Sequence, residues 1–572
     1  MKDSEDGPMA DGTQRLPDTD HLDAVVVGAG VAGLYMLYRL RALGLSTRVF
    51  EAGDNVGGTW YWNRYPGARC DIESIDYSYS FSDDLQQEWD WSERYATQPE
   101  ILRYVNHVAD RFDLRRDIRF ETRVTATHFD ERNNHWSIET DRGDHVTASF
   151  CIMATGCLSS SQVPAIPGLD RFQGRWYHTG QWPHEGVDFT GQRVGVIGTG
   201  SSGIQSIPVI ASHAAHVYVF QRTPNFSVPA HNAPLDPEYV RQIKANYAER
   251  RRKARESRSG FLVPLNKNTE TPALDVSPEV RREEYEARWA RGGFGLMASF
   301  SDLYSNKAAN DTAAAFVHEK IRKIVHDPAV AEKLLPRDHP VGTKRLCVDS
   351  GYYATYNRDN VTLVDIRSAP IEEITPDGLR TRDSAYTLDS IVFATGFDAM
   401  TGALNRIDIR GRGGEALREK WVAGPRTYLG IASAGFPNLF LITGPGSPSV
   451  LSNMMTSIEQ HVEWTTECID YLRERRIDTI EPTLEAEDDW VDHVNDLAQE
   501  TLYPTAGSWY MGANIPGKPR IFMPYVGGVG TYRKRCAEIA ANGYEGFVLT
   551  TMSERELPAS ESTMAAPSPL SS

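Results

Sequence analysis

Two glycine-rich segments carry residues whose types and spacing could bind a dinucleotide. In the first, GAGVAG, the glycines Gly28, Gly30 and Gly33 follow an apolar run, residues 23–27, and precede a segment with helical spacing. Such glycines permit a tight turn, close approach of backbone amides to a pyrophosphate, and packing of helix on strand. Glu51 stands at the end of the next predicted strand, where a carboxylate could accept hydrogen bonds from a ribose diol. This segment is therefore predicted to be a dinucleotide-binding βαβ unit.

The second segment, GTGSSG, repeats this pattern but differs where the ribose would lie. The strand expected after its helix ends at Gln221 and Arg222, followed by Thr223, with no acidic residue. A carboxylate would repel a 2′-phosphate, whereas a guanidinium and a hydroxyl would bind one. The sequence thus predicts NADPH instead of NADH, although Arg222 could be only a surface cation at a strand end. The residues of the motif expected to bind the cofactor are Gly198, Gly200, Ser201, Ser202 and Gly203.

These two units predict the fold class. The first unit lies near the N-terminus of the chain, a position that suits FAD in flavoproteins with two dinucleotides; this inference rests on analogy. Two ATG triplets, residues 154–156 and 394–396, each follow an apolar strand and predict where the chain crosses between two such domains. Between Leu235 and roughly Leu335 the sequence is charged and helical in its spacing. We expect an α/β flavoprotein with two Rossmann-like domains and an inserted helical subdomain.

The predicted domain boundaries follow from these changes along the chain. Both ends are polar and low in apolar residues, so they are expected to be disordered. The predicted parts are a tail at 1–20, an FAD-binding domain at 21–157 and 391–552, an NADPH-binding domain at 158–230 and 336–390, a helical subdomain at 231–335, and a tail at 553–572.

Composition and charge exclude several classes of protein. The 572 residues include 60 Lys and Arg against 77 Asp and Glu, a formal net charge of −17. Such a chain repels phosphate backbones and anionic membranes, and no apolar run is long enough to span a bilayer. The basic run with Arg251, Arg252, Lys253 and Arg255 is interpreted as a solvated helix face, not as a nucleic-acid patch. We expect no nucleic-acid partner, no membrane span and no obligate protein partner.

Cysteine usage and the N-terminal residues predict the compartment. The six cysteines form no CxxC pair, which fits a reducing compartment and argues against a zinc site or a disulfide-reducing centre. The first 20 residues are acidic and lack the apolar core of a signal peptide. A cytoplasmic location is expected, and no metal site is predicted.

Two longer segments carry a resemblance to a known family. Phe172, Gly174, His178 and Trp182 stand in FQGRWYHTGQWP, just before the second glycine motif. Their spacing resembles the fingerprint of the Baeyer–Villiger monooxygenases, flavoproteins that insert an oxygen atom beside a ketone carbonyl. GGTWYWNRYPGARCD, residues 57–71, is similar to the longer fingerprint of that family. The likeness covers nearly the whole chain and is most similar to the phenylacetone and steroid monooxygenase branch.

The resemblance implies FAD and NADPH as cofactors, and it implies roles for several residues. It assigns Arg345 to the flavin face and Lys344 to the 2′-phosphate of NADPH, beside Arg222 and Thr223. Asp71, at the end of the longer fingerprint, needs a partner if it is buried, and Arg345 is the most attractive one. A fixed cation would lower the pKa of a C4a-peroxyflavin and stabilise the alkoxide formed when the anion attacks a ketone. Arg345 and Asp71 are therefore the predicted catalytic residues.

Other residues receive binding or hinge roles from the same resemblance. Gly58, Trp60 and Asp71 are expected beside the flavin, although Trp60 could simply be a core aromatic residue. Trp509 is expected to fold over the bound cofactor, with a mobile loop before it that gates the site; its alternative is a buried anchor. His178 is interpreted as a hydrogen-bonding hinge residue, not as a base. The implied ketone pocket is apolar and consists of Cys70, Ile72, Leu346, Val450, Leu451, Met454 and Met523.

These inferences predict an NADPH- and O2-dependent oxidation of an aromatic, cyclic or steroid-like ketone to an ester or lactone. One alternative is a related flavin monooxygenase that oxygenates nitrogen or sulfur through the hydroperoxyflavin, which needs no cationic Arg345. Another is a redox-sensing protein that holds FAD and NADPH without turnover. The apolar pocket and the Asp71 and Arg345 pair argue against the sensor.

Overall fold

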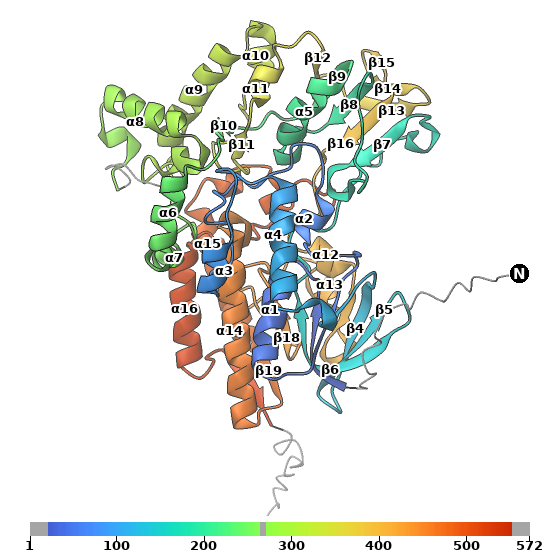
Figure 1. Ribbon diagram of the computed structural model, residues 1–572, viewed down its shortest axis with the longest axis vertical. Helices are drawn as coiled ribbons and strands as arrows, with labels where there is room; N and C mark the ends of the chain where they lie inside the picture. Colours follow the sequence, from blue (N-terminus) through green and yellow to red (C-terminus); the bar gives the residue numbers. More distant parts are fainter. Residues whose placement is uncertain (1–20, 263–269, 552–572) are drawn as a thin grey trace, which may run out of the picture.

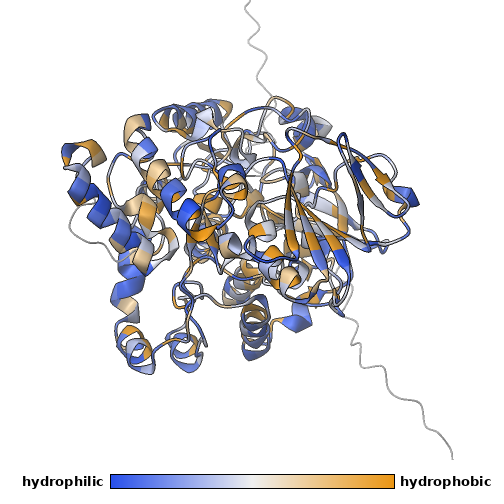
Figure 2. Cartoon of the chain, turned by 90° about the horizontal axis from the view of Figure 1, so that it is seen from above, coloured by the Kyte–Doolittle hydropathy of each residue, from blue (hydrophilic) through white to orange (hydrophobic). Residues whose placement is uncertain are grey.

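The computed structural model describes residues 21–262 and 270–551. Two sheets with parallel cores lie in two parts of the molecule, and a group of helices flanks the second sheet (Figure 1). Hydrophobic segments gather in the strands and inner helices, whereas the outer helices are largely hydrophilic (Figure 2). Residues 1–20 and 553–572, which the sequence predicts to be tails, lie outside the described residues.

The first sheet contains the N-terminal glycine motif. Its strand order is β17-β4-β5-β6-β1-β2-β3, and β18 also pairs with β6. All pairs are parallel except β4 with β5 and β5 with β6. The helix α1 (Val31–Ala42) follows β1 and packs against α14 (Met454–Arg475). The strands are β1 His21–Val27, β2 Thr47–Phe50, β3 Ile118–Arg119, β4 Val124–Asp130, β5 His135–Thr140, β6 His145–Met153, β17 Asp408–Arg410 and β18 Leu439–Leu441.

The second sheet contains the other glycine motif. Its order is β12-β9-β8-β16-β7, and all of its pairs are parallel. The helix α5 (Ser201–His213) joins β8 to β9. The strands are β7 Arg175–His178, β8 Arg193–Ile197, β9 His216–Gln221, β12 Val361–Asp365 and β16 Ser390–Phe393. Since both motifs lie between a parallel strand and a helix, the predicted fold class is confirmed.

A helical segment is inserted between two short paired strands of the second part. The strands β10 (Ser227–Pro229) and β11 (Cys347–Asp349) are parallel neighbours, so the chain returns to the point where the insertion began. The described residues between them form helices and no strand. These helices are α6 Pro237–Ala245, α7 Tyr247–Glu256, α8 Pro278–Arg291, α9 Lys307–Ile324 and α10 Pro328–Leu334.

The basic run on α7 differs from the sequence-based expectation. Arg251 is only 7% exposed, and it donates hydrogen bonds to Gln86 and Ser78 in the first part of the molecule. Arg252 and Lys253 are exposed and pair with glutamates of their own helix. The prediction of a solvated face therefore holds for one side of α7 and is wrong for the other. Residues far away in the sequence cover that other side, so the local pattern could not reveal its burial.

The ATG triplets lie at the crossings between the two parts. Ala154 directly follows β6 of the first sheet, and Ala394 directly follows β16 of the second. Because β16 pairs with β8 and β7, the chain leaves the second sheet after Phe393. This crossing lies a few residues beyond the boundary predicted at 390. The pairing of β16 with β7 and β8, which sequence alone does not fix, sets the difference.

Smaller elements complete the fold. The C-terminal helix α16 (Val529–Ala541) packs against α14 and α7. Among the described residues, no helix is long and apolar enough to cross a membrane. All six cysteines are free and buried. The remaining helices and strands are α2 Thr59–Trp62, α3 Asp83–Glu88, α4 Gln98–Arg111, α11 Tyr352–Thr355, α12 Gly402–Asn405, α13 Leu417–Lys420, α15 Leu484–Gln499, β13 Ile371–Thr375, β14 Gly378–Thr381, β15 Ala385–Thr387, β19 Thr479–Pro482 and β20 Phe547–Thr550.

Candidate functional site

The first glycine loop turns tightly between β1 and α1. Gly28 has φ +104, and a Cβ added there would lie 2.6 Å from the carbonyl oxygen of Ala154. A Cβ on Gly33 would lie 1.8 Å from the carbonyl oxygen of Gly28. Only glycine fits both positions. Gly30 faces Gly58 of the longer fingerprint, since its Cβ would lie 3.3 Å from that Cα.

Glu51 lies directly after β2 and braces this loop. Its Oε2 accepts a hydrogen bond from the backbone N–H of Ala29 at 2.7 Å, and its Oε1 accepts one from Gly53 at 2.8 Å. Burial raises the pKa of Glu51, and the two N–H donors partly offset that effect. A third backbone N–H, that of Ala52, also hydrogen-bonds this carboxylate. Because a carboxylate has about four acceptor positions, Glu51 can still accept from a ribose hydroxyl. The residues of this loop therefore fit an adenine dinucleotide such as FAD.

Trp60, expected beside the flavin, is buried in the hydrophobic core of the first part. Its indole Nε1 donates a hydrogen bond to the Tyr77 hydroxyl at 3.1 Å, and its carbonyl accepts one from Gln98. Gly58, two residues earlier, has φ +51. Trp60 therefore anchors the segment on which Gly58 approaches the glycine loop.

The second glycine loop has the same backbone but more open space. Gly198 has φ +110, and a Cβ on Gly203 would lie 2.3 Å from the carbonyl oxygen of Gly198. A Cβ on Gly200 would meet nothing within 4 Å, and Gly200 is exposed. Ser201 and Ser202 begin α5 there and are only partly buried. An exposed helix N-terminus with free space in front of it fits a pyrophosphate.

Cations gather at the end of β9, where the sequence predicts a 2′-phosphate. Arg222 is exposed there, and Lys344 lies near enough that the charges of Arg222 and Arg367 both affect it. Burial lowers the pKa of Lys344, and the Asp338 carboxylate opposes this shift. Arg367 donates hydrogen bonds from Nη2 to the Thr223 hydroxyl at 3.3 Å and to Asp338 Oδ2 at 2.8 Å. Three cations, with the Asp338 carboxylate among them, therefore lie near the end of β9, where the sequence predicts the 2′-phosphate.

Arg367 was not predicted from the sequence. It follows β12, which is the parallel neighbour of β9, with Asp365 opposite Gln221. Parallel strands end on the same edge of a sheet, so residues after β12 and after β9 meet there. Only the order of the strands brings Arg367 to this edge of the sheet, and the sequence alone does not reveal that order.

Arg345 and Asp71 form the predicted pair. Arg345 Nε donates a hydrogen bond to Asp71 Oδ2 at 3.0 Å, and Nη2 donates one to Oδ1 at 2.7 Å. Arg345 Nη1 donates to the carbonyl oxygen of Val450 at 2.8 Å. The side chains are 25% and 20% exposed. Burial disfavours the charge of Arg345, but the Asp71 carboxylate and Tyr510 more than offset it, so its pKa is raised.

Two aromatic residues complete the surroundings of this guanidinium. Phe294, from the helical insertion, places its ring centre 5.1 Å from the Arg345 guanidinium carbon. Tyr510 is buried, which raises its pKa. Cation–π contact of this kind stabilises a positive charge that has little access to water. Four segments of the chain, those of Asp71, Phe294, Val450 and Tyr510, thus surround one permanent cation.

The apolar residues predicted to line a ketone pocket divide among three hydrophobic clusters. Cys70 and Ile72 belong to the core of the first part, and Leu346 to the core of the second. A third cluster, which also contains Tyr510, includes Val450, Leu451, Met454 and Met523. Cys70 and Ile72 flank Asp71, Leu346 follows Arg345, and the Val450 carbonyl accepts from Arg345, so residues of all three clusters adjoin the ion pair.

The fingerprint residues lie at the crossing between the two parts. His178 ends β7, which is an edge strand of the second sheet. Its Nδ1 accepts a hydrogen bond from Gly180 N–H at 3.0 Å, and its Nε2 lies 3.4 Å from the Thr395 hydroxyl. Its ring contacts Phe397 edge-on. Burial lowers the pKa of His178, which suits a structural contact to the crossing segment.

The other fingerprint residues pack around the same strand. Phe172 covers Gly174, where a Cβ would lie 2.5 Å from the Asp389 carbonyl oxygen. Trp182 is buried against Tyr177 in the core of the second part. The fingerprint therefore shapes the edge of the second sheet.

Trp509 begins a short 3-10 turn and packs on Tyr510, with ring centres 4.2 Å apart. The loop after it is tied to the crossing segment. Asn514 Nδ2 donates to the Phe397 carbonyl oxygen at 2.7 Å, and Lys518 pairs with Asp398 at 2.6 Å. These contacts connect the loop carrying Trp509 to the segment that His178 contacts.

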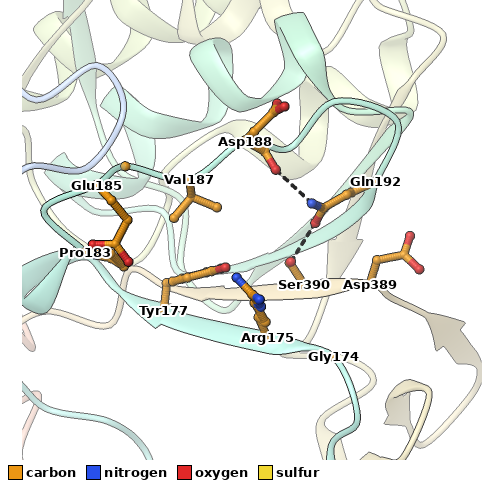
Figure 3. A pocket seen from close by; sticks show the side chains of 11 residues that line it. Gly174, Arg175, Tyr177, Pro183, Glu185, Val187, Asp188, Gln192, Asp389 and Ser390 are labelled. Atoms are coloured by element: carbon orange, nitrogen blue, oxygen red, sulfur yellow. Dashed lines mark hydrogen bonds between the residues drawn. The ribbon is translucent and has the colours of Figure 1, made fainter.

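Two cavities lie away from the Asp71 and Arg345 pair. One of about 430 Å³ is lined by residues of β7 and β16 (Figure 3). In its wall, Ser390 donates a hydrogen bond to Gln192, and Gln192 donates one to the Asp188 carbonyl oxygen. Another of about 470 Å³ shares residues 185–188 with it. Neither is lined by Asp71 or Arg345.

The fold and the two loops define a flavoprotein oxidoreductase with two dinucleotide-binding domains. A family model described as pyridine nucleotide-disulphide oxidoreductase matches residues 25–260. A Baeyer–Villiger monooxygenase from Pseudooceanicola batsensis is 44% identical, over 93% of this chain and 97% of the relative. A solved structure of an oxidized steroid monooxygenase bound to NADP is 57% identical, covers 93% of this chain and 99% of its own, and has a TM-score of 0.88. OTEMO in complex with FAD and NADP is 44% identical, covers 92% and 99%, and has a TM-score of 0.89.

The chain belongs to the Baeyer–Villiger monooxygenases, enzymes that use FAD and NADPH. The resemblance predicted from the fingerprints is therefore confirmed, together with the cofactors that it implied.

Proposed function

We propose that this chain converts an uncharged aromatic, cyclic or steroid-like ketone to an ester or lactone, with NADPH and O2 as co-substrates. The observation that carries the proposal is the permanent cation Arg345, held by Asp71 and the Val450 carbonyl where the apolar clusters meet. Oxygen insertion into a ketone develops negative charge on oxygen, and such a fixed cation would stabilise that charge. Oxygenation of an amine or sulfide does not require it.

Arg345 is proposed as the catalytic residue, and Asp71 holds it in place. The bidentate contact to Asp71 fixes the plane of the guanidinium, while Nη1 is directed by the Val450 carbonyl. FAD, when bound, supplies electron transfer from NADPH and the activation of O2. Since the pKa of Arg345 is raised, its charge does not change with pH in the working range.

The two loops are proposed to hold the two cofactors. Gly28, Gly30, Gly33, Glu51 and Gly58 would bind FAD. The loop from Gly198 to Gly203 would bind the NADPH pyrophosphate, and Arg222, Thr223 and Lys344 would bind its 2′-phosphate, joined by Arg367.

The ketone is proposed to lie against the third apolar cluster, beside Arg345. Val450, Leu451, Met454 and Met523 bring aliphatic and thioether groups there, which suit an uncharged substrate of adaptable shape. The similarity to a steroid monooxygenase supports a bulky ketone.

Trp509 and His178 are proposed to act in conformational steps. Trp509 would cover the bound NADPH, with its loop as a gate, and His178 would act as a hinge contact. We further propose that the enzyme works in the cytoplasm and without an obligate protein partner; the six free, buried cysteines support a reducing compartment.

The test offers a phenyl or cyclic ketone and an alkyl sulfide to the purified flavoenzyme with NADPH and ¹⁸O2. We expect an ester that carries one ¹⁸O atom and NADPH consumption that the ketone accelerates. Sulfoxide without ester would favour the heteroatom-oxygenating alternative. NADPH consumption that no substrate accelerates would favour the redox sensor.

A further inference from the structure

Asp76 lies at the centre of buried contacts that join three separate parts of the chain. Its Oδ1 and Oδ2 accept hydrogen bonds from Arg250 Nε at 2.7 Å and Nη2 at 2.6 Å. The Asp76 side chain is 2% exposed and that of Arg250 is 12% exposed. The Asp76 carbonyl oxygen accepts hydrogen bonds from Asn453 Nδ2 at 2.8 Å and Arg251 Nη1 at 3.2 Å. The loop after the longer fingerprint, the start of α14 and the inserted helix α7 therefore meet at one residue.

These contacts connect the two segments that hold Arg345. On one side, Asp71 precedes Asp76 on the same loop, and its carboxylate holds Nε and Nη2 of Arg345. On the other side, the Val450 carbonyl oxygen accepts a hydrogen bond from Nη1, and Asn453 lies three residues after Val450 in the same segment. Since Asn453 binds Asp76, the two segments that hold the guanidinium are tied to each other.

The loop before Asn453 has a conformation that needs such support. Ser449 has φ 34, in the left-handed region that side chains other than glycine rarely adopt. Asn453 caps α14 by accepting from Met455 N–H, and its own N–H donates to the Ser259 carbonyl of the helical insertion. A strained backbone persists only where its surroundings fix it. The insertion thus supports this loop as well as Asp76.

We propose that Asp76 is a positioning residue for Arg345. Through the ion pair of Asp76 with Arg250, the helical insertion then influences how much ester is formed per NADPH consumed. This inference rests on the proposed role of Arg345. Burial of an ion pair costs desolvation free energy, and the attraction between the charges offsets this cost only when the geometry is good. We therefore expect the Asp76 and Arg250 pair to fix the orientation of the loop more than it adds to the stability of the fold. Within the described part of the chain, the hydrogen bonds and ion pairs of Arg250 and Asp76 reach no residue assigned to substrate or cofactor.

The experiment neutralises the pair with amides of similar shape, in the double variant Asp76→Asn and Arg250→Gln. Glu284→Gln with Arg288→Gln is the matched control, because that pair is also buried and its 2.6 Å contact lies within α8 of the same insertion. A misplaced catalytic group loses rate steeply, so we expect ester formed per NADPH to fall about tenfold in the test variant, with hydrogen peroxide rising. Flavin reduction by NADPH should stay near the parent rate, and the control should match the parent in both respects.

A second readout does not depend on turnover. Cys70 adjoins Asp71 and is buried, so alkylation of its thiol reports loosening of that loop. Peptide mapping should show Cys70 labelled about tenfold faster in the test variant, because local opening exposes only that segment. Cys468 and Cys536, both in the core, should react at the parent rate. A role limited to overall stability would accelerate all three together.

The outcomes separate this inference from the proposed function. If the parent forms ester and the test variant matches the control in coupling and in Cys70 labelling, the positioning role is overturned and the function stands. If the parent forms no ester from any ketone, both fail. Should the double variant not fold, Asn453→Ser decides, since serine keeps the helix cap and loses the contact to Asp76. Normal coupling in a folded Asn453→Ser enzyme would also overturn the proposal.

Discussion

The two glycine loops share one backbone geometry and end on opposite charges. A Cβ added to Gly33 would lie 1.8 Å from the carbonyl oxygen of Gly28, and a Cβ added to Gly203 would lie 2.3 Å from that of Gly198. The strand after each helix then leads to a buried Glu51 in one unit and an exposed Arg222 in the other. The shared backbone suits the pyrophosphate site proposed in both, and the side chain at the strand end is the one expected to select the ribose.

The loops also differ in what covers them. Gly58 approaches Gly30 in the first loop, whereas nothing lies within 4 Å of a Cβ on Gly200 in the second. A covered loop suits a cofactor that stays bound, and an open loop suits one that enters and leaves. The difference supports the proposed division between an FAD that stays bound and an NADPH that exchanges.

The largest expected effect comes from closing each loop in turn. Gly33→Ala forces a methyl group into a backbone carbonyl, and such overpacking costs about 3 kcal/mol or more. We expect little folded yellow protein, measured as flavin absorbance per protein. Gly203→Ala meets a backbone carbonyl at 2.3 Å in the second unit, so it should lose reduction by NADPH. Because the first loop is unchanged, we expect its folded fraction to keep its flavin. Equal flavin loss in both variants would contradict the division between the loops.

Arg345→Ala tests the group that lies between the two units. Ester formation should fall about 10²- to 10³-fold, the usual loss when one such charge-stabilising donor is removed. Flavin content and its reduction by NADPH should stay near normal, because both loops are intact. Arg345→Lys is the control; it keeps the charge without the bidentate contact and should be intermediate. Near-normal ester formation in the alanine variant would remove Arg345 from the chemistry.

Making the second loop resemble the first should change the cofactor preference. In Gln221→Glu with Arg222→Ala, a carboxylate replaces the cationic strand end. Loss of a charge-assisted hydrogen bond costs about 1.5–3 kcal/mol, so KM for NADPH should rise about 10- to 100-fold. KM for NADH should change little. Arg252→Ala, which removes an exposed arginine paired within α7, should leave both unchanged.

The smallest expected effect is a pH dependence from Lys344. Burial lowers its pKa, so it begins to lose its proton at a lower pH than an ordinary lysine. A 2′-phosphate binds the protonated form, so KM for NADPH should rise a few-fold as pH rises through that lowered pKa. Lys344→Arg should flatten the profile, because arginine stays charged. An unchanged profile in this variant would place the titration elsewhere.

Local patterns predicted the two βαβ units well. Each strand, turn and helix lies within a short stretch of chain, where spacing of apolar residues and glycines determines the structure. The strand Arg193–Ile197 directly precedes the second glycine motif, as the repeated pattern predicts. The helix Val31–Ala42 begins within the first glycine motif and continues through the segment where the helical spacing predicts it.

Long-range contacts were not accessible in the same way. The Asp71 and Arg345 pair, separated by 274 residues, was named from a family resemblance and not from spacing. To predict the position of Arg367 would have required the order of the strands. To predict the burial of Arg251 would have required the packing of α7 against the first part of the molecule.

The sequence alone determined the repeated dinucleotide units, the charge at each strand end and the family. These features are local, or they are written in short motifs. Only the tertiary structure decided which side of α7 is buried, where Asp76 joins three segments, and how Arg345 is held. Packing between distant segments sets those contacts, and no neighbouring residue specifies them.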